Sequence, residues 1–196
     1  EECMYTFEEW KKNLIIVRGG GDIATGTIYK LYQSRFTVLV LEIANPSCIR
    51  RTISFCEAVF DKKVEVEGVT AKRAESLEDA FAIYGQGQIP VMIDENGSMI
   101  QEVQPPVVVD AILAKRNLGT KITDAPAVIG VGPGFCAGKD VDAVIETQRG
   151  HNLGRVIYEG EAAPNTGIPG MIGGYAKERV IHASATGKLH ILRQIG

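Results

Sequence analysis

The sequence contains no apolar run that could cross a membrane. A spanning helix needs about 20 consecutive apolar residues, and every apolar run in this chain is much shorter. The first dozen residues are polar and acidic, so they lack the basic and apolar regions of a signal peptide. These absences predict a cytoplasmic protein with no membrane partner.

The chain also lacks an excess of positive charge. Its 196 residues include 21 Lys and Arg against 24 Asp and Glu, which gives a formal net charge of −3 at pH 7. A nucleic-acid-binding protein needs a basic face, and this charge balance predicts no nucleic-acid partner. The hydrophobic content of 45% is ordinary for a globular protein, and the length allows one large core or two small domains.

Cysteine is scarce, and its spacing matches no metal or redox motif. The four cysteines are Cys3, Cys48, Cys56 and Cys136. They form no C-x-x-C pair and show no zinc-ligand spacing. We therefore expect free thiols and no metal site.

The stretch 14–26 is the most informative part of the chain. An apolar, strand-like run breaks into consecutive glycines and then into helical spacing. Gly19, Gly21 and Ala24 fit G-x-G-x-x-G/A, and Glu42 closes the next apolar run about 20 residues on, as in a dinucleotide fingerprint. The pattern predicts backbone N–H groups that receive a pyrophosphate at a helix N-terminus. The candidate binding residues here are Gly19, Gly20, Gly21, Asp22 and Glu42. A Rossmann-like unit that binds no dinucleotide remains the alternative.

Strand and helix patterns alternate up to about residue 135. Strands are predicted at 14–17, 36–43, 90–93, 107–109 and 127–131, with a β-hairpin over 64–73. Helices are predicted from an N-cap at Asp22, after Ser76, and from a cap at Asp110 to Arg116. Thr6 and Glu9 fit a capping box before Trp10, and 94–98 reads as a turn. The alternation predicts an α/β, Rossmann-like domain with a mostly parallel sheet over 13–138.

The pattern changes after Gly138. Short strands are predicted at 143–147, 154–158, 179–183 and 188–192, with glycine-rich connections between them. These predict a smaller β-rich, barrel-like domain over 139–196. Because the last predicted strand ends close to Gly196, we expect this domain to be incomplete.

Further candidate residues lie in three other segments. Gly132 and Gly134 follow a strand and could line a crevice, although Pro133 removes a donor and a purely structural turn is the alternative.

Arg50 and Arg51 could hold an anion through bidentate hydrogen bonds, or could simply be solvated. Because Glu42 would repel a 2′-phosphate, a dinucleotide without that phosphate is favoured.

The loop over 149–155 concentrates polar side chains in the second half. Arg149, His151, Asn152 and Arg155 could orient a phosphate or carboxylate, and His151 could transfer a proton near neutral pH. No Ser, Cys or carboxylate pairs with His151 in the sequence, so the catalytic residues are unknown. A structural loop is the alternative interpretation.

Several motifs together resemble a known family. They lie at 17–26, 41–52, 109–115, 129–135, 146–157 and 165–170. Through them the chain resembles the YqeB-type proteins of selenium-dependent molybdenum hydroxylase systems, and its N-terminal half is similar to the Rossmann-like part of XdhC-type factors. The resemblance implies an accessory role in maturing a molybdenum hydroxylase.

Three functions follow as hypotheses. The first is an accessory protein that binds a molybdopterin-type or nucleotide cofactor, a small anionic ligand, and presents it to the hydroxylase apoprotein. Its contacts would be the first glycine loop, Arg50, Arg51 and the 149–155 loop. The second is an NAD-dependent oxidoreductase, and the third is a non-catalytic scaffold that contacts the hydroxylase. The sequence leaves open whether the chain is an enzyme and whether it forms a homo-oligomer.

Overall fold

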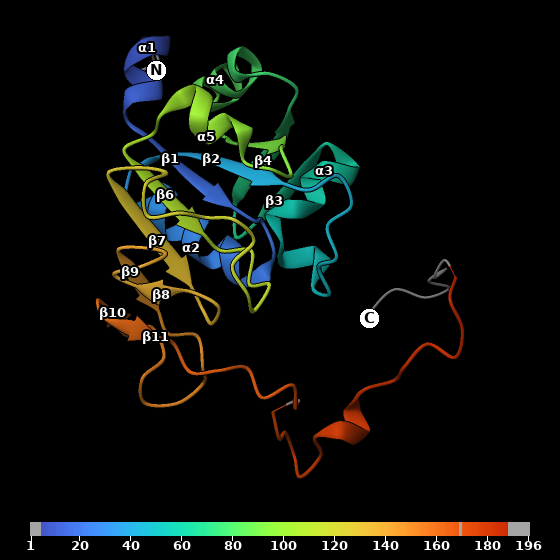
Figure 1. Cartoon of the computed structure of the whole chain (residues 1–196). Helices are drawn as coiled ribbons and strands as arrows, with labels where there is room; N and C mark the ends of the chain where they lie inside the picture. Colours follow the sequence, from blue (N-terminus) through green and yellow to red (C-terminus); the bar gives the residue numbers. More distant parts are fainter. Residues whose placement is uncertain (1–4, 169, 188–196) are drawn as a thin grey trace. The chain divides into compact units, whose positions relative to one another are not determined.

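A computed structural model describes residues 5–168 and 170–187, and a large mixed sheet forms its centre (Figure 1). Within the described residues, the strands in sheet order are β10 (Val156–Ile157), β9 (Ala143–Ile145), β7 (Ala127–Val131), β6 (Val107–Asp110), β1 (Leu14–Arg18), β2 (Thr37–Glu42), β5 (Ile89–Ile93), β4 (Val69–Ala74) and β3 (Lys63–Val66). Neighbouring strands are parallel except in the β3–β4 and β9–β10 pairs. A separate antiparallel pair joins β8 (Cys136–Ala137) to β11 (Gly160–Glu161).

The helices lie before or between the strands of the main sheet. In chain order they are α1 (Phe7–Lys12), α2 (Asp22–Gln33), α3 (Ala58–Asp61), α4 (Leu77–Gly85) and α5 (Ser98–Val103), with short 3₁₀ turns at Arg51–Ile53, Phe55–Glu57 and Lys177–Arg179. The predicted α/β class, with a mostly parallel sheet and a smaller β-rich part, is confirmed.

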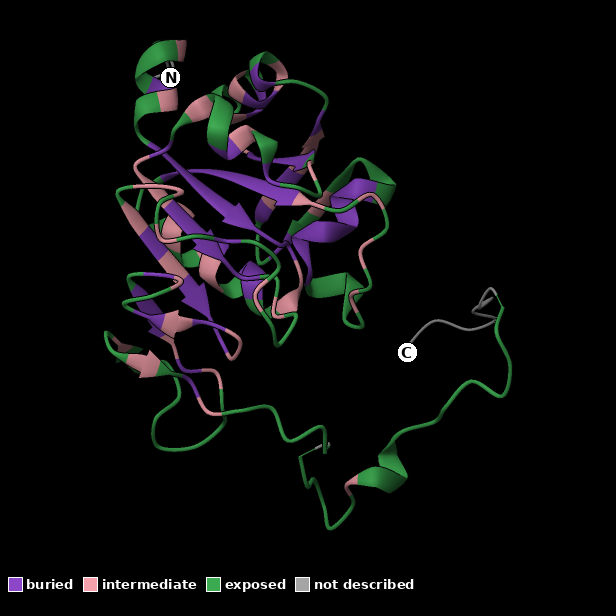
Figure 2. Cartoon of the chain, in the orientation of Figure 1, coloured by how far each residue is buried: buried purple, intermediate pink, exposed green. Residues whose placement is uncertain are grey.

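Both faces of the central strand are buried. Every residue of β1 is buried, as expected for a parallel strand covered on two sides. Ile16 belongs to a core on one face together with Leu39 and Val108, whereas Val17 packs on the other face against Ile28 of α2. Figure 2 shows this buried centre and the exposed surface around it. The rigid sheet fixes where the loops after β1 and β2 begin.

The N-terminal helix closes one end of the core. The predicted capping box is confirmed, because Thr6 accepts from the Glu9 N–H and the Glu9 carboxylate accepts from the Thr6 N–H. Trp10 is fully buried, and its ring lies 5.6 Å from that of Phe81 on α4. Helix α1 is therefore part of the folded domain.

One helix predicted after β2 is absent from the part of the chain that the structure describes. The segment after Asp110 forms no helix, because Leu113 and Lys115 adopt positive φ angles of 60° and 63° that a helix excludes. The predicted turn over 94–98 is present at residues 95–96, but its last residue, Ser98, is the first residue of helix α5, which the sequence pattern did not predict. At the first helix the N-cap is Gly21 rather than Asp22, which is the first helical residue.

The chain divides into two compact units, Glu1–Pro164 and Asn165–Gly196. This division differs from the predicted domains, 13–138 and 139–196, because β9 pairs with β7 and β10 pairs with β9 in the main sheet. The predicted strand at 179–183 is absent from the described residues, where a 3₁₀ turn ends at Arg179. The predicted strand at 188–192 lies outside the described residues.

Candidate functional site

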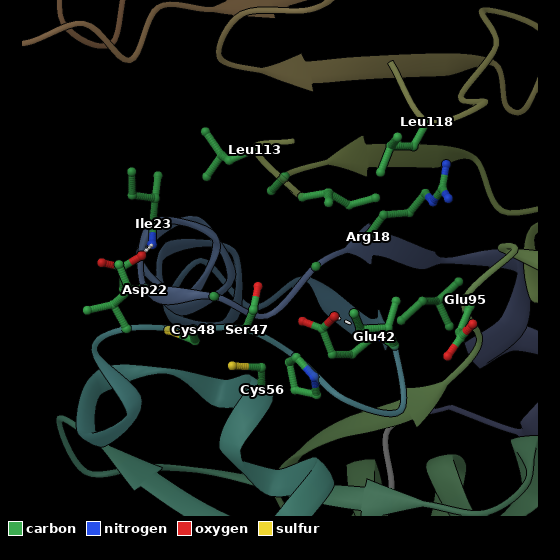
Figure 3. Close-up of a pocket in the computed structure, with 18 of the residues that line it drawn as sticks. Arg18, Asp22, Ile23, Glu42, Ser47, Cys48, Cys56, Glu95, Leu113 and Leu118 are labelled. Atoms are coloured by element: carbon green, nitrogen blue, oxygen red, sulfur yellow. Dashed lines mark hydrogen bonds between the residues drawn. The ribbon is translucent and has the colours of Figure 1, made fainter. Parts of the chain in front are cut away.

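The loops after β1 and β6 diverge at the middle of the sheet. From β1 the chain passes through α2 to β2 on one side, whereas β6 lies on the other side of β1. In open α/β sheets, ligands bind in the crevice outside the carboxyl ends of the strands at such a switch point. A crevice of about 590 Å³ lies at this place, between the loops that follow β1, β2, β5 and β6 (Figure 3).

The first glycine loop forms one wall of this crevice. Gly19 has φ +91°, and a Cβ there would lie 2.9 Å from the Ile112 Cα. A Cβ on Gly20 would lie 2.9 Å from the Cys56 backbone nitrogen. These two glycines are therefore required by close packing of one loop on another.

Gly21 differs from its two neighbours. Its backbone is extended, with φ −64° and ψ 179°, and a Cβ would meet nothing within 4 Å. Neither its conformation nor its packing requires glycine, yet it lines the crevice. An absent side chain at this position leaves the backbone open to close approach by a ligand.

The backbone N–H groups of the glycine loop also differ between the first two glycines and Gly21. The Gly19 N–H donates to the Leu41 carbonyl at 2.8 Å, and the Gly20 N–H donates to Glu42 Oε2 at 2.8 Å. Within the part of the chain that the structure describes, the N–H groups of Gly21 and Asp22 have no hydrogen-bond partner. They begin helix α2, so they present two donors and the positive end of a helix dipole to an anion.

Glu42 connects the loops after β1 and β2. Its Oε2 accepts from Gly20 and its Oε1 accepts from the N–H of Ile43 at 2.8 Å. Burial raises the pKa of Glu42, and these two hydrogen bonds oppose that effect. Because each carboxylate oxygen can accept more than one bond, Glu42 can also receive a ribose hydroxyl from the crevice.

The two predicted arginines have different positions. Arg50 lines the crevice, where its Nη1 lies 2.9 Å from Oδ2 of Asp22. Arg51 is outside the crevice lining and makes a bidentate pair with Glu57. Of these two arginines, Arg50 alone lines the crevice, and its charge is partly balanced by Asp22.

The second glycine loop is explained by packing. Gly132 and Gly134 have positive φ angles of 83° and 113°. A Cβ on Gly132 would lie 2.9 Å from the Leu113 Cδ2, and one on Gly134 would lie 2.6 Å from the Arg116 Cα. Neither residue lines the crevice, so the structure favours the turn interpretation for this loop.

The 149–155 loop lies away from the crevice. Arg149, His151, Asn152 and Arg155 are exposed, and none of them lines the crevice. Their loop follows β9, which β7 and β6 separate from β1. Three strand spacings of about 4.8 Å place these strand ends roughly 14 Å apart. The structure does not bring this loop together with the first glycine loop.

Several crevice residues were not predicted from the sequence. They are Arg18, Cys48, Cys56, Asp94, Glu95 and Lys115. Arg18 precedes the glycine loop directly, so a charged residue at the end of an apolar strand was an available signal. The others come from loops whose positions depend on the folded sheet.

The charges and thiols of the crevice limit its chemistry. The lining carboxylates of Asp22, Glu42, Asp94 and Glu95 nearly balance the cations of Arg18, Arg50 and Lys115. Burial, together with the neighbouring Cys48, raises the pKa of the Cys56 thiol, which keeps that thiol protonated and a weak nucleophile. Among the described residues, no cluster of metal-ligating side chains is present, and no helix there is long and apolar enough to cross a bilayer.

Together, the fold and the crevice define this chain as a Rossmann-like α/β domain with a glycine-rich loop at the switch point of its sheet. Over 174 residues, 89% of this chain, the sequence is 53% identical to the uncharacterized protein YqeB of Escherichia coli (strain K12). The predicted resemblance to YqeB-type proteins is thereby confirmed. The chain spans 32% of that relative's length. No family model matches the chain, and no solved structure matches it.

Proposed function

We propose that this chain is the cofactor-binding part of an accessory protein for maturation of a selenium-dependent molybdenum hydroxylase. In this proposal, the crevice at the carboxyl ends of β1 and β6 holds the phosphate portion of a nucleotide or molybdopterin-type cofactor. The hydroxylase role rests on the sequence motifs that resemble YqeB-type systems. The binding role rests on the geometry of the crevice.

The open backbone at Gly21 is the observation that carries the binding role. A glycine without positive φ or close packing lines the crevice and leaves two helix N–H donors free. These features fit a phosphate, which accepts hydrogen bonds from a helix N-terminus. The exposed guanidinium of Arg50 stands beside them and can add a charge-assisted bond.

A substitution that fills this space tests the binding role. Gly21→Glu places a bulky anion where the phosphate would lie, so we expect binding of NADH and ADP to be lost. Gly26→Glu is the matched control, because Gly26 is exposed on helix α2, has open space for a Cβ and does not line the crevice. Fluorescence titration with NADH and calorimetry with ADP supply the two readouts.

The ligand is identified on freshly purified full chain. Mass spectrometry of released small molecules should detect a pterin or a nucleotide in the wild-type protein and in Gly26→Glu, but not in Gly21→Glu. If no such molecule is released, and neither NADH nor ADP binds, the cofactor-binding role fails.

The position of Glu42 favours a second candidate, an NAD-dependent oxidoreductase. Glu42 is the last residue of β2, and it lines the crevice. The acidic residue that binds the ribose in a dinucleotide site lies at this position. This candidate predicts that NADH binds more tightly than ADP and NADPH, and that NADH is consumed with a suitable acceptor. A hydroxylase pull-down that survives Gly21→Glu, with no binding of any cofactor, supports the scaffold hypothesis instead.

A further inference from the structure

Arg18 lies at the boundary between two cavities. It is the last residue of β1, and its side chain is only 7% exposed. It lines both the crevice described above and a second cavity of about 430 Å³. Figure 3 shows its side chain at the crevice, with the guanidinium directed away from Glu42.

The buried guanidinium uses only one edge within the protein. Its Nη1 donates to Thr120 Oγ1 at 2.6 Å, and the Thr120 hydroxyl donates to Asp110 Oδ2. Nη1 also lies 3.6 Å from that carboxylate oxygen. Among the described residues, the Nε and Nη2 groups have no hydrogen-bond partner. These two groups carry the parallel N–H bonds that bind a carboxylate or phosphate side-on.

The free edge borders the second cavity. Gly97, at the turn after β5, lines that cavity, and a Cβ built on Gly97 would lie 3.5 Å from Arg18 Nε. The small residue at this turn therefore leaves space beside Nε. Gly97 has φ +70°, so the turn conformation also favours glycine.

The second cavity is polar, and its lining residues carry more positive than negative charge, while Asp110 behind the lining balances part of the charge of Arg18. Its charged lining consists of Arg18, Lys121 and Asp124. The Asp124 carboxylate already accepts the Lys121 backbone N–H at 2.9 Å. The uncharged polar residues of the lining are Asn96, Ser98, Gln101 and Thr123. An anion that displaces water here meets one buried and one exposed cation together with amide and hydroxyl groups.

We propose that the second cavity is a binding subsite for the carboxylate or phosphate group of a small-molecule substrate. The Nε and Nη2 groups of Arg18 bind the anion side-on, and Lys121 adds a second positive charge. The subsite goes beyond the proposed function, because it requires no cofactor in the neighbouring crevice. It gives the domain room for two ligands with Arg18 between them.

The experiment measures binding of two simple probes to the full chain. Inorganic phosphate is followed by phosphorus NMR line broadening, and succinate by saturation-transfer NMR. We expect at least one probe to bind, and the probe that binds identifies the anionic group. If neither probe binds the wild-type chain, the inference is overturned.

Variants of the exposed lysine test the subsite without disturbing the core. Lys121→Gln should weaken binding of the probe severalfold, by loss of one charge at the cavity. Lys139→Gln is the matched control, because Lys139 is also exposed and lies outside both cavities. Equal binding by these two variants would contradict the role of Lys121.

The buried arginine needs a variant that keeps the core neutral. Arg18→Gln alone leaves Asp110 buried without its cation, which destabilises the fold, so the double variant with Asp110→Asn is used. We expect it to lose at least about tenfold in probe affinity, whereas Gly21→Glu should retain binding. If Gly21→Glu loses probe binding and the double variant retains it, the probe binds in the glycine-loop crevice. That result overturns the subsite, although the proposed function would stand.

Discussion

Alanine substitution at three glycines separates packing from ligand binding. A methyl group on Gly20 would lie 2.9 Å from a backbone nitrogen, which cannot move without shifting the loop. We expect Gly20→Ala to lower the free energy of unfolding by about 1–3 kcal/mol. Gly21→Ala meets open space and should cost less than about 1 kcal/mol, mainly through a poorer N-cap. Gly26→Ala should raise stability by about 0.5–1 kcal/mol, since it lies inside helix α2.

Cofactor binding should follow a different order. Gly21→Ala puts its methyl group where the backbone would approach a phosphate, so we expect the Kd for NADH or ADP to rise at least about tenfold. Gly26→Ala should bind as the wild type does. Urea unfolding followed by Trp10 fluorescence measures stability, and fluorescence titration measures Kd. The reasoning is refuted if Gly21→Ala unfolds as easily as Gly20→Ala, or if it binds both ligands with unchanged affinity.

Three further substitutions or conditions give simple outcomes. Burial raises the pKa of Glu42, so NADH binding should weaken as pH falls through that raised value, because the protonated carboxyl loses an acceptor. A pH series of NADH titrations that shows no change in affinity down to acid unfolding would contradict this. Hydrogen bonds from the backbone N–H groups of Ala163 and Gln148 lower the pKa of Glu146. The ionised Glu146 carboxylate therefore stabilises the folded chain above the pKa that Glu146 has when unfolded. This stabilisation is lost as pH falls through the lower pKa of the folded state. Glu146→Gln should speed hydrogen exchange at the Ala163 amide about tenfold, the loss of one charge-assisted bond. Trp10→Ala should cost about 3–5 kcal/mol in urea unfolding, because the side chain is fully buried; a cost under about 1 kcal/mol would show that α1 is not part of the core.

Local signals predicted the centre of the fold well. The strand, glycines, helix and terminal acid at 14–42 each depend on residues close in sequence, and the structure contains all of them. The Thr6–Glu9 capping box is equally local and is confirmed. The helix predicted from Asp110 failed because tertiary contacts decide that segment. The Asp110 carboxylate accepts the Ile112 N–H, as an N-cap would. Its other oxygen accepts the Thr120 hydroxyl beside Arg18, and no helix follows in this described segment.

The sequence predicted the residues of the candidate site only where its pattern also implied which strands are neighbours in the sheet. Gly21 and Asp22 follow β1, and Glu42 ends the adjacent strand β2, so one pattern placed them together. The 149–155 loop follows a strand near the sheet edge, and no feature of its sequence gives that distance. Arg51 resembled Arg50 in sequence, but its pairing with Glu57 depends on a 3₁₀ turn formed by the folded chain.

The hydrogen bonds of Glu42 have a consequence for the energetics of ligand capture. One carboxylate holds the backbone of Gly20 on one wall and of Ile43 on the other, so the two walls are preorganised with respect to each other. The conformational entropy of ordering them has already been lost when the chain folds. A ligand entering between them therefore meets a lower entropic barrier than one that must gather two independent loops.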